Sequence, residues 1–135
     1  MLNILIKNLS KLKTASIYKK SSIIVYDYNK NFIQIIKILY QQGFIKSFFI
    51  FKKKLKKKYI AGIYIFLKYS IITNRGLLDS LKIVSKQSIK VNVQYVDLCK
   101  IRKKNKFYLF STFKGFIHLE ACLKNRIGGQ LLFII

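Results

Sequence analysis

The chain has few of the side chains that carry out catalysis or bind metals. Its 135 residues include one histidine, two cysteines and four acids, and the acids are scattered at Asp27, Asp79, Asp97 and Glu120. No two carboxylates have the fixed spacing that acid–base catalysis needs, and nothing near His118 would orient it as a base. Cys99 and Cys122 with one histidine make no zinc site. We therefore expect a binding protein, not an enzyme, without metal or cofactor.

Long hydrophobic segments are also missing. The longest uninterrupted apolar run, Tyr59 to Leu67, is much shorter than the roughly 20 residues that cross a bilayer. Asn3, Lys7 and Asn8 interrupt the first apolar residues, so these predict neither a signal peptide nor a transit peptide. We expect no transmembrane segment, and a reducing compartment in which both thiols are inert.

Acidic side chains are rare as well. The 27 lysines and arginines leave a formal net charge of +23, although 52% of the residues are hydrophobic and predict a folded chain. Such self-repulsion destabilises a compact monomer unless a polyanion neutralises it. RNA or DNA is the favoured partner, and an anionic membrane surface is the alternative. No feature predicts a small-molecule substrate.

Proline and tryptophan are absent, whereas residues with A/T-rich codons, such as isoleucine, lysine and phenylalanine, are abundant. This bias indicates an A/T-rich genome. Together with the missing import signal, it favours an organelle-encoded protein of the mitochondrion. A plastid or an A/T-rich bacterial cytoplasm is the alternative.

Hydrophobic periodicity predicts an N-terminal domain over residues 1–72 with the order α-β-α-β-β. Its first helix either docks on its own domain or lies on a membrane surface. Lys52 to Lys58 holds six lysines in seven residues, and we expect a mobile loop that is either a solvated tip or a contact for nucleic-acid phosphates. The expected elements are helices at 2–14 and 29–43 and strands at 23–26, 44–51 and 59–69.

A change of composition at residues 71–80 predicts a second domain over 73–135, so the fold class is α+β. We expect an antiparallel sheet with short helices, and a basic loop at 102–106. The expected elements are strands at 81–85, 89–93, 108–110 and 131–135 and helices at 96–101 and 117–126.

The stretch Ser111-Thr112-Phe113-Lys114-Gly115 is the candidate site. It is expected to be a strand end and a tight loop before a short helix, with Ser111 and Thr112 capping that helix or reaching outward. Gly115 lets a ligand approach the backbone, and Gly128-Gly129 predicts a turn before the last strand. Hydroxyls and a lysine on such a loop suit sugar and phosphate oxygens, whereas an ordinary turn capped by serine and threonine is the alternative.

The same segment resembles a known family. Ser111 to Ile117, Glu120-Ala121 and Asn125 to Gln130 resemble the signature of small-subunit ribosomal protein eight, of bacterial and organellar type. Ile6-Lys7-Asn8 and Leu39 to Ile45 resemble two further motifs of that family. The resemblance covers nearly the whole chain.

The resemblance implies an α-β-α-β-β domain packed on a C-terminal antiparallel domain, and a protein that binds the central domain of small-subunit rRNA during assembly, beside neighbouring ribosomal proteins. It implies RNA contacts by residues of the last third and of the first helix. These are Ser111, Thr112, Lys114, Gly115, Lys7 and Asn8, with Gly128 and Gly129 shaping the adjacent surface and Phe113 included as part of the same loop.

Two departures from the family pattern affect details of that site. Phe113 stands where the family has a second serine, and it is expected to stack on a base instead of donating a hydroxyl. Gln130 stands where a glutamate is usual, which removes a negative charge near the RNA. A cationic membrane-surface protein and a free nucleic-acid-binding regulator are the alternative functions.

Overall fold

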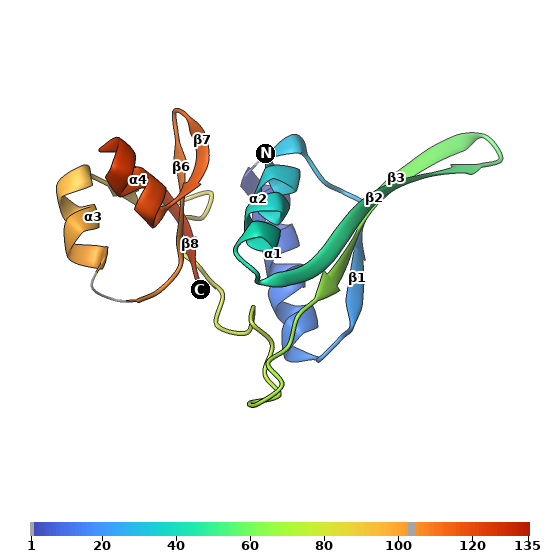
Figure 1. The fold of residues 1–135 in the computed structure, drawn as a ribbon. Helices are drawn as coiled ribbons and strands as arrows, with labels where there is room; N and C mark the ends of the chain where they lie inside the picture. Colours follow the sequence, from blue (N-terminus) through green and yellow to red (C-terminus); the bar gives the residue numbers. More distant parts are fainter. Residues whose placement is uncertain (1, 103–104) are drawn as a thin grey trace. The chain divides into compact units, whose positions relative to one another are not determined.

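The chain divides into two compact units, Met1–Asp79 and Ser80–Ile135. The computed structural model describes residues 2–102 and 105–135, so Lys103 and Lys104 of the expected basic loop lie outside the described residues (Figure 1). The α+β class predicted from the sequence is confirmed. The first unit extends to Asp79 because Ser16 Oγ and the Gly76 N–H both donate to the carboxylate of Asp79, at 2.5 and 3.0 Å.

The first unit has the predicted order of two helices and three strands. The strands are all antiparallel, in the order β1-β3-β2. The elements are α1 Leu2–Ile17, β1 Ser22–Val25, α2 Lys30–Gln41, β2 Ile45–Leu55 and β3 Lys58–Leu67.

α1 and α2 pack against the β1-β3-β2 sheet and bury their apolar side chains between the helices and the sheet. α2 begins where the Asn29 side chain accepts the Phe32 N–H at 2.9 Å, and its apolar stripe is fully buried. α1 buries a stripe that includes Leu5, Leu9 and Leu12. Because that stripe is packed inside its own unit, it is not available to a membrane. Within residues 2–102 and 105–135, none of the helices has both the length and the apolarity that a membrane crossing requires.

The lysine run is not the loop that was expected. β2 continues to Leu55 and β3 restarts at Lys58, so only Lys56 and Lys57 form the turn. The paired strands form an arm that projects beyond the helices of its unit (Figure 1). Strand pairing uses backbone groups, so it continues although residues 52–60 are all exposed to solvent. The arm presents four of its six lysines on paired strands and the other two, Lys56 and Lys57, at its turn.

The second unit is an antiparallel sheet with two short helices. Its main strand order is β4-β8-β6-β7, and β5 also pairs with β8. The bounds are β4 Lys82–Ile83, β5 Asn92–Val93, α3 Tyr95–Ile101, β6 Tyr108–Thr112, β7 Gly115–His118, α4 Leu119–Asn125 and β8 Gly129–Ile134. β4 and β5 are shorter than the strands predicted there, and β7 occupies the start of the predicted final helix.

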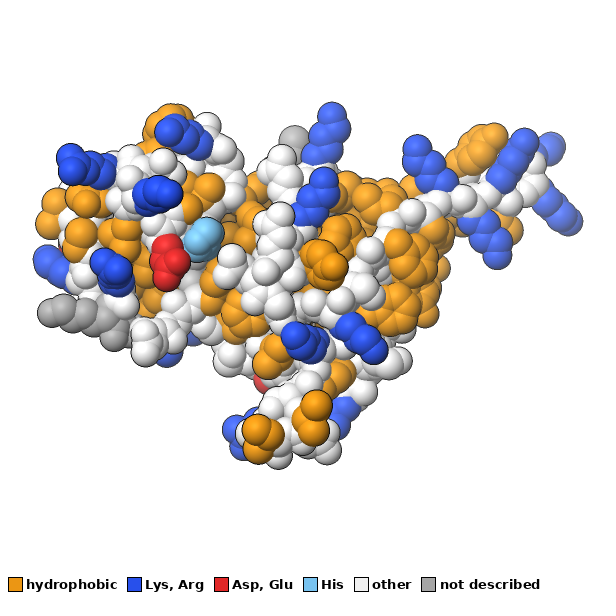
Figure 2. Space-filling model, in the orientation of Figure 1, with side chains coloured by type: hydrophobic (Ala, Val, Ile, Leu, Met, Phe, Trp, Pro, Cys, Tyr) orange, Lys and Arg blue, Asp and Glu red, His pale blue; other side chains and the backbone are white. Residues whose placement is uncertain are grey.

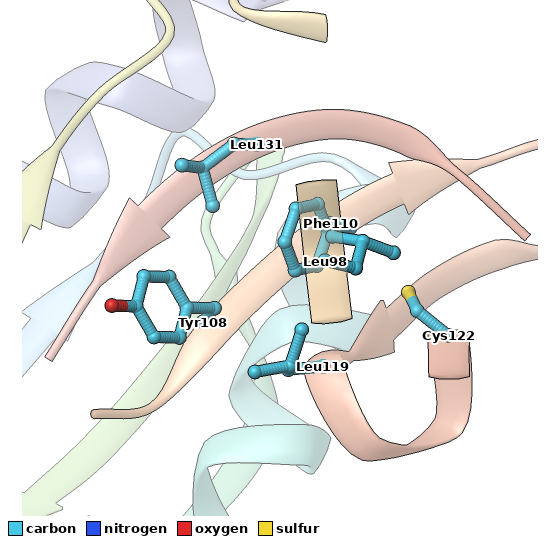
Figure 3. Close-up of a cluster of buried hydrophobic side chains, with 6 residues drawn as sticks. All are labelled: Leu98, Tyr108, Phe110, Leu119, Cys122 and Leu131. Carbon is cyan, nitrogen blue, oxygen red and sulfur yellow. The ribbon is translucent and has the colours of Figure 1, made fainter. Parts of the chain in front are cut away.

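A compact apolar cluster joins the sheet to both helices of this unit. Phe110 on β6 is fully buried at its centre, beside Leu98 from α3 and Cys122 from α4 (Figure 3). Tyr108, Leu119 and Leu131 complete the cluster. This core fixes β6, the strand from which the candidate site extends.

The two cysteines should differ in reactivity. Burial raises the pKa of the Cys122 thiol to about 11, whereas Cys99 is exposed. At pH 8 a thiol reagent should therefore modify Cys99 quickly, and Cys122 only after denaturation. Because the raised pKa favours the neutral thiol in the folded chain, its contribution to stability is present below about pH 9 and is lost as the pH rises towards 11. Reagent titration with and without denaturant tests this, and equal rates for both thiols in the folded protein would contradict it.

Candidate nucleic-acid interface

The candidate site is a tight hairpin between β6 and β7. Thr112 pairs with Gly115, and Phe113 and Lys114 form the turn. The Thr112 hydroxyl donates to the Gly115 carbonyl at 2.9 Å and accepts the Lys114 N–H at 3.2 Å. The threonine therefore holds the turn together. The expectation that Ser111 and Thr112 cap a helix is wrong, because the chain continues into β7 and places Ile117 opposite Phe110.

Gly115 supplies the backbone conformation that closes this hairpin. Its φ is +103°, whereas Phe113 and Lys114 have no positive φ. A residue in the left-handed region after the turn is usual in short hairpin loops, and glycine adopts it without strain. A Cβ built on Gly115 would meet no atom within 4 Å, so this side of the backbone is open. A ligand can approach it closely.

The tip of the hairpin combines a ring with a cation. The Phe113 side chain is 82% exposed, and the ammonium of Lys114 lies 5.8 Å from the centre of its ring. An exposed phenylalanine beside a lysine is poorly suited to a water-facing turn. It suits a nucleic acid, where the ring stacks on a base and the ammonium approaches a phosphate.

Gly128 and Gly129 act through their small size. Neither has a positive φ, and the left-handed residue that ends α4 is Arg126, at φ 54°. The expectation of a turn at the glycine pair is therefore wrong. A Cβ on Gly129 would lie 2.7 Å from the Ser111 carbonyl oxygen, and one on Gly128 would lie 2.6 Å from the Val93 carbonyl oxygen. The two glycines let β8 pack closely against β6 and against the end of β5.

A row of polar side chains crosses the sheet at the base of the hairpin. Gln130 on β8 is in register with Ser111 on β6 and with Asn92 on β5, so the three share one face. Within the described part of the chain, the Gln130 side-chain nitrogen is buried without a hydrogen-bond acceptor. Sequence reasoning placed Gln130 near the RNA only through the family pattern, and it did not include Asn92. Their alignment depends on strand register, which local sequence does not encode.

The two candidates from the first helix differ from each other. Lys7 is exposed on α1. Asn8 is fully buried, and its amide nitrogen donates to the Asp27 carbonyl oxygen at 2.6 Å. The expectation that Asn8 reaches an RNA backbone is therefore corrected: in this structure its side chain links α1 to the end of β1.

Comparison with known proteins agrees with the resemblance noted in the sequence. The family model of ribosomal protein S8 matches residues 3–135. The chain belongs to the ribosomal protein S8 family. It is 33% identical over 129 residues to small ribosomal subunit protein uS8c of Bigelowiella natans, covering 96% of this chain and 95% of that protein. It is 32% identical over 112 residues to small ribosomal subunit protein uS8 of Phytoplasma mali, covering 83% and 81%.

Membership of the ribosomal protein S8 family makes this chain a structural protein of the small ribosomal subunit and not an enzyme. Its charge distribution fits that role. Among the described residues the one salt bridge joins Lys100 to Asp97, at 3.5 Å. On the face shown in Figure 2, lysines and arginines are spread over both units and along the β2–β3 arm, with few acids among them. Most of the positive charge is therefore available to an external polyanion.

Proposed function

We propose that this chain binds the central domain of small-subunit rRNA through the β6–β7 hairpin, supports assembly of that domain, and lies beside other ribosomal proteins. The observation that carries the proposal is the exposed tip: Phe113, Lys114 and the open backbone at Gly115 project together from a strand anchored in the core. A site on rigid elements can hold its contacts at fixed positions.

Each residue of the proposed interface has a distinct role. The Ser111 hydroxyl offers a hydrogen bond to sugar or phosphate oxygens. Phe113 stacks on an unpaired base, and Lys114 and Lys7 lie on phosphates. The other members of the set shape the surface: Thr112 and Gly115 set the turn, and Gly128 and Gly129 bring the strands together.

We propose an organellar ribosome as the location, with the mitochondrial ribosome as the first candidate. The A/T-biased residue usage supports it. The relatives are bacterial uS8 and uS8c proteins, and the uS8c relatives include one of Euglena gracilis, 29% identical over 133 residues. A plastid ribosome is thus the main alternative. To distinguish these locations, small subunits are prepared from purified mitochondria and from purified plastids and washed with high salt. The chain should sediment with the small subunits of the organelle in which it works. A chain found only in free or membrane fractions would contradict a ribosomal location.

Substitutions at Thr112 test the hairpin directly. We expect Thr112→Val, which keeps the shape and removes the hydroxyl, to weaken binding to the rRNA central domain by about 1–3 kcal/mol. Two hydrogen bonds of the turn are lost, so Phe113 and Lys114 are no longer held in place. Thr112→Ser keeps the hydroxyl and should bind nearly as the original chain does. Equal affinity of the valine and serine variants, measured by filter binding or calorimetry, would contradict the role of the hairpin.

A further inference from the structure

One edge of the first unit's sheet has no neighbouring strand. The order β1-β3-β2 puts β1 at an edge within the part of the chain that the structure describes. The Leu67 N–H donates to the Ser21 carbonyl at 3.0 Å, and Ile23 is in register with Ile65. Because antiparallel pairing alternates, the N–H and C=O groups of Ser22 and Ile24 point away from β3. β1 therefore presents a short row of free backbone donors and acceptors.

A hollow adjoins this free edge. Its volume is about 820 Å³, and its walls are β1 and one side of α1. The α1 residues that line it lie at positions 7, 10, 11, 14 and 15, which form one stripe along the helix, and Tyr18 follows directly after the helix. Ser22 and Ile24, whose backbone groups are free, line the opposite wall. The hollow thus provides space beside the unpaired edge, with a helix alongside it.

The lining has the character of a site for an acidic, amphipathic segment. Lys11 and Lys20 supply positive charge, and no acidic side chain among the described residues lines the hollow. Tyr18 and Tyr26 are 73% and 55% exposed and supply rings with a hydroxyl at the tip. Exposed tyrosines and aliphatic side chains beside a free strand edge are features of peptide-binding surfaces.

We propose that the free edge of β1 pairs with an extended, acidic segment of another small-subunit protein, which occupies the hollow as a fourth strand. Free N–H and C=O groups recur along a strand edge at about 6.8 Å, a spacing that another strand matches. Nucleic acid has no such alternating donors and acceptors. Lysines alone would suit RNA equally well, so the strand edge is what favours a polypeptide. The proposal rests on the chain's place in the small subunit and not on the β6–β7 hairpin.

Hydrogen exchange of the edge amides tests the proposal. The full chain is compared in its complex with small-subunit rRNA alone and in complete small subunits. We expect the N–H groups of Ser22 and Ile24 to exchange at least tenfold more slowly in the subunit than in the RNA complex, while that of Ile23, which faces β3, is protected in both. Protection already present with rRNA alone would assign the hollow to RNA. Rapid exchange in both samples would show that the edge stays open. Either result overturns the proposal.

Two variants provide a second test. Ile24→Pro removes the outward N–H without removing a bond to β3, since that N–H lies on the free side. Lys11→Glu reverses a charge in the hollow, and Lys37→Glu makes the same change at an exposed site of α2 outside it. In the complete subunit, the Ser22 N–H of the Ile24→Pro and Lys11→Glu chains is expected to exchange about tenfold faster than that of the original chain. Lys37→Glu should leave this exchange rate unchanged. Equal effects of the two glutamate variants would contradict a specific site. Because rRNA binding is measured separately with the Thr112 variants, failure here leaves the proposed function standing.

Discussion

Replacing the six lysines of the β2–β3 arm with glutamine is expected to weaken rRNA binding strongly and to flatten its salt dependence. All six lysines are exposed and form no ion pair within the described residues, so their charge is available to an external partner. The ammonium of Lys54 also lies 5.6 Å from the centre of the Tyr59 ring. If each lysine lies on one phosphate, the slope of log K against log salt should become shallower by about 4–5. Affinities measured at several salt concentrations for both chains give this slope. The variant replaces Lys52, Lys53, Lys54, Lys56, Lys57 and Lys58.

A control with the same charge change separates the arm from net charge. Six exposed lysines elsewhere are replaced with glutamine, which leaves the same formal charge. We expect this control to change the slope much less than the arm variant does. Equal slopes for the two variants would show that only total charge matters and that the arm has no contact of its own. The control positions are Lys30, Lys37, Lys82, Lys86, Lys90 and Lys124.

Two phenylalanines on the same hairpin should have opposite effects when each is replaced with alanine. Phe110 is fully buried in the core of the second unit, so Phe110→Ala is expected to lower the free energy of unfolding by about 3–5 kcal/mol. Phe113 is 82% exposed, so Phe113→Ala should change it by no more than about 0.5 kcal/mol. If Phe113 stacks on a base, Phe113→Ala should instead weaken rRNA binding by about 1–3 kcal/mol.

The two variants are measured by denaturant unfolding and by RNA binding under one set of conditions. A Phe113→Ala chain that binds rRNA as tightly as the original chain would remove the stacking contact from the proposed interface. A Phe110→Ala chain with unchanged stability would show that the cluster around Leu98 and Cys122 does not hold β6 in place.

The features that sequence could predict are those set by local patterns. Apolar residues at helical spacing located α1 and α2, and Asn29 and Gly43 marked where α2 begins and ends. Runs of β-branched and aromatic residues located β1 and the apolar parts of β2 and β3. The α+β class and the element order of the first unit follow from these patterns.

What the sequence did not predict depends on contacts between distant residues. Gly115-Phe116-Ile117-His118 has no strong strand signal, and it forms β7 because it pairs with β6. The lysine run forms strands because Lys52, Lys53 and Lys54 pair across to residues 59–61. Asn8 is a polar residue on an amphipathic helix and was expected at the surface, yet it is buried because the Asp27 carbonyl accepts its amide.

In the candidate site, too, some features follow from local sequence and others from contacts between distant residues. The hydroxyls, the lysine and Gly115 were identified from their order in the chain and from the family resemblance. The roles of Gly128 and Gly129 were not, since the close approach of β8 to Ser111 and Val93 appears only in the folded chain. Local sequence thus located the loop, whereas the pairing of β6 with β7 and tertiary packing determine which of its residues are free to meet RNA.

Mapping ultraviolet crosslinks between this chain and RNA in purified small subunits tests the central claim most directly. An aromatic ring stacked on a base is well placed to crosslink, so the peptide containing Phe113 should carry a nucleotide from the central domain of the small-subunit rRNA. The crosslink should disappear in Phe113→Leu, which retains an apolar side chain without the ring. A Phe113 peptide free of RNA in intact subunits, together with unchanged affinity of the Thr112→Val and Phe113→Ala chains, would contradict the account.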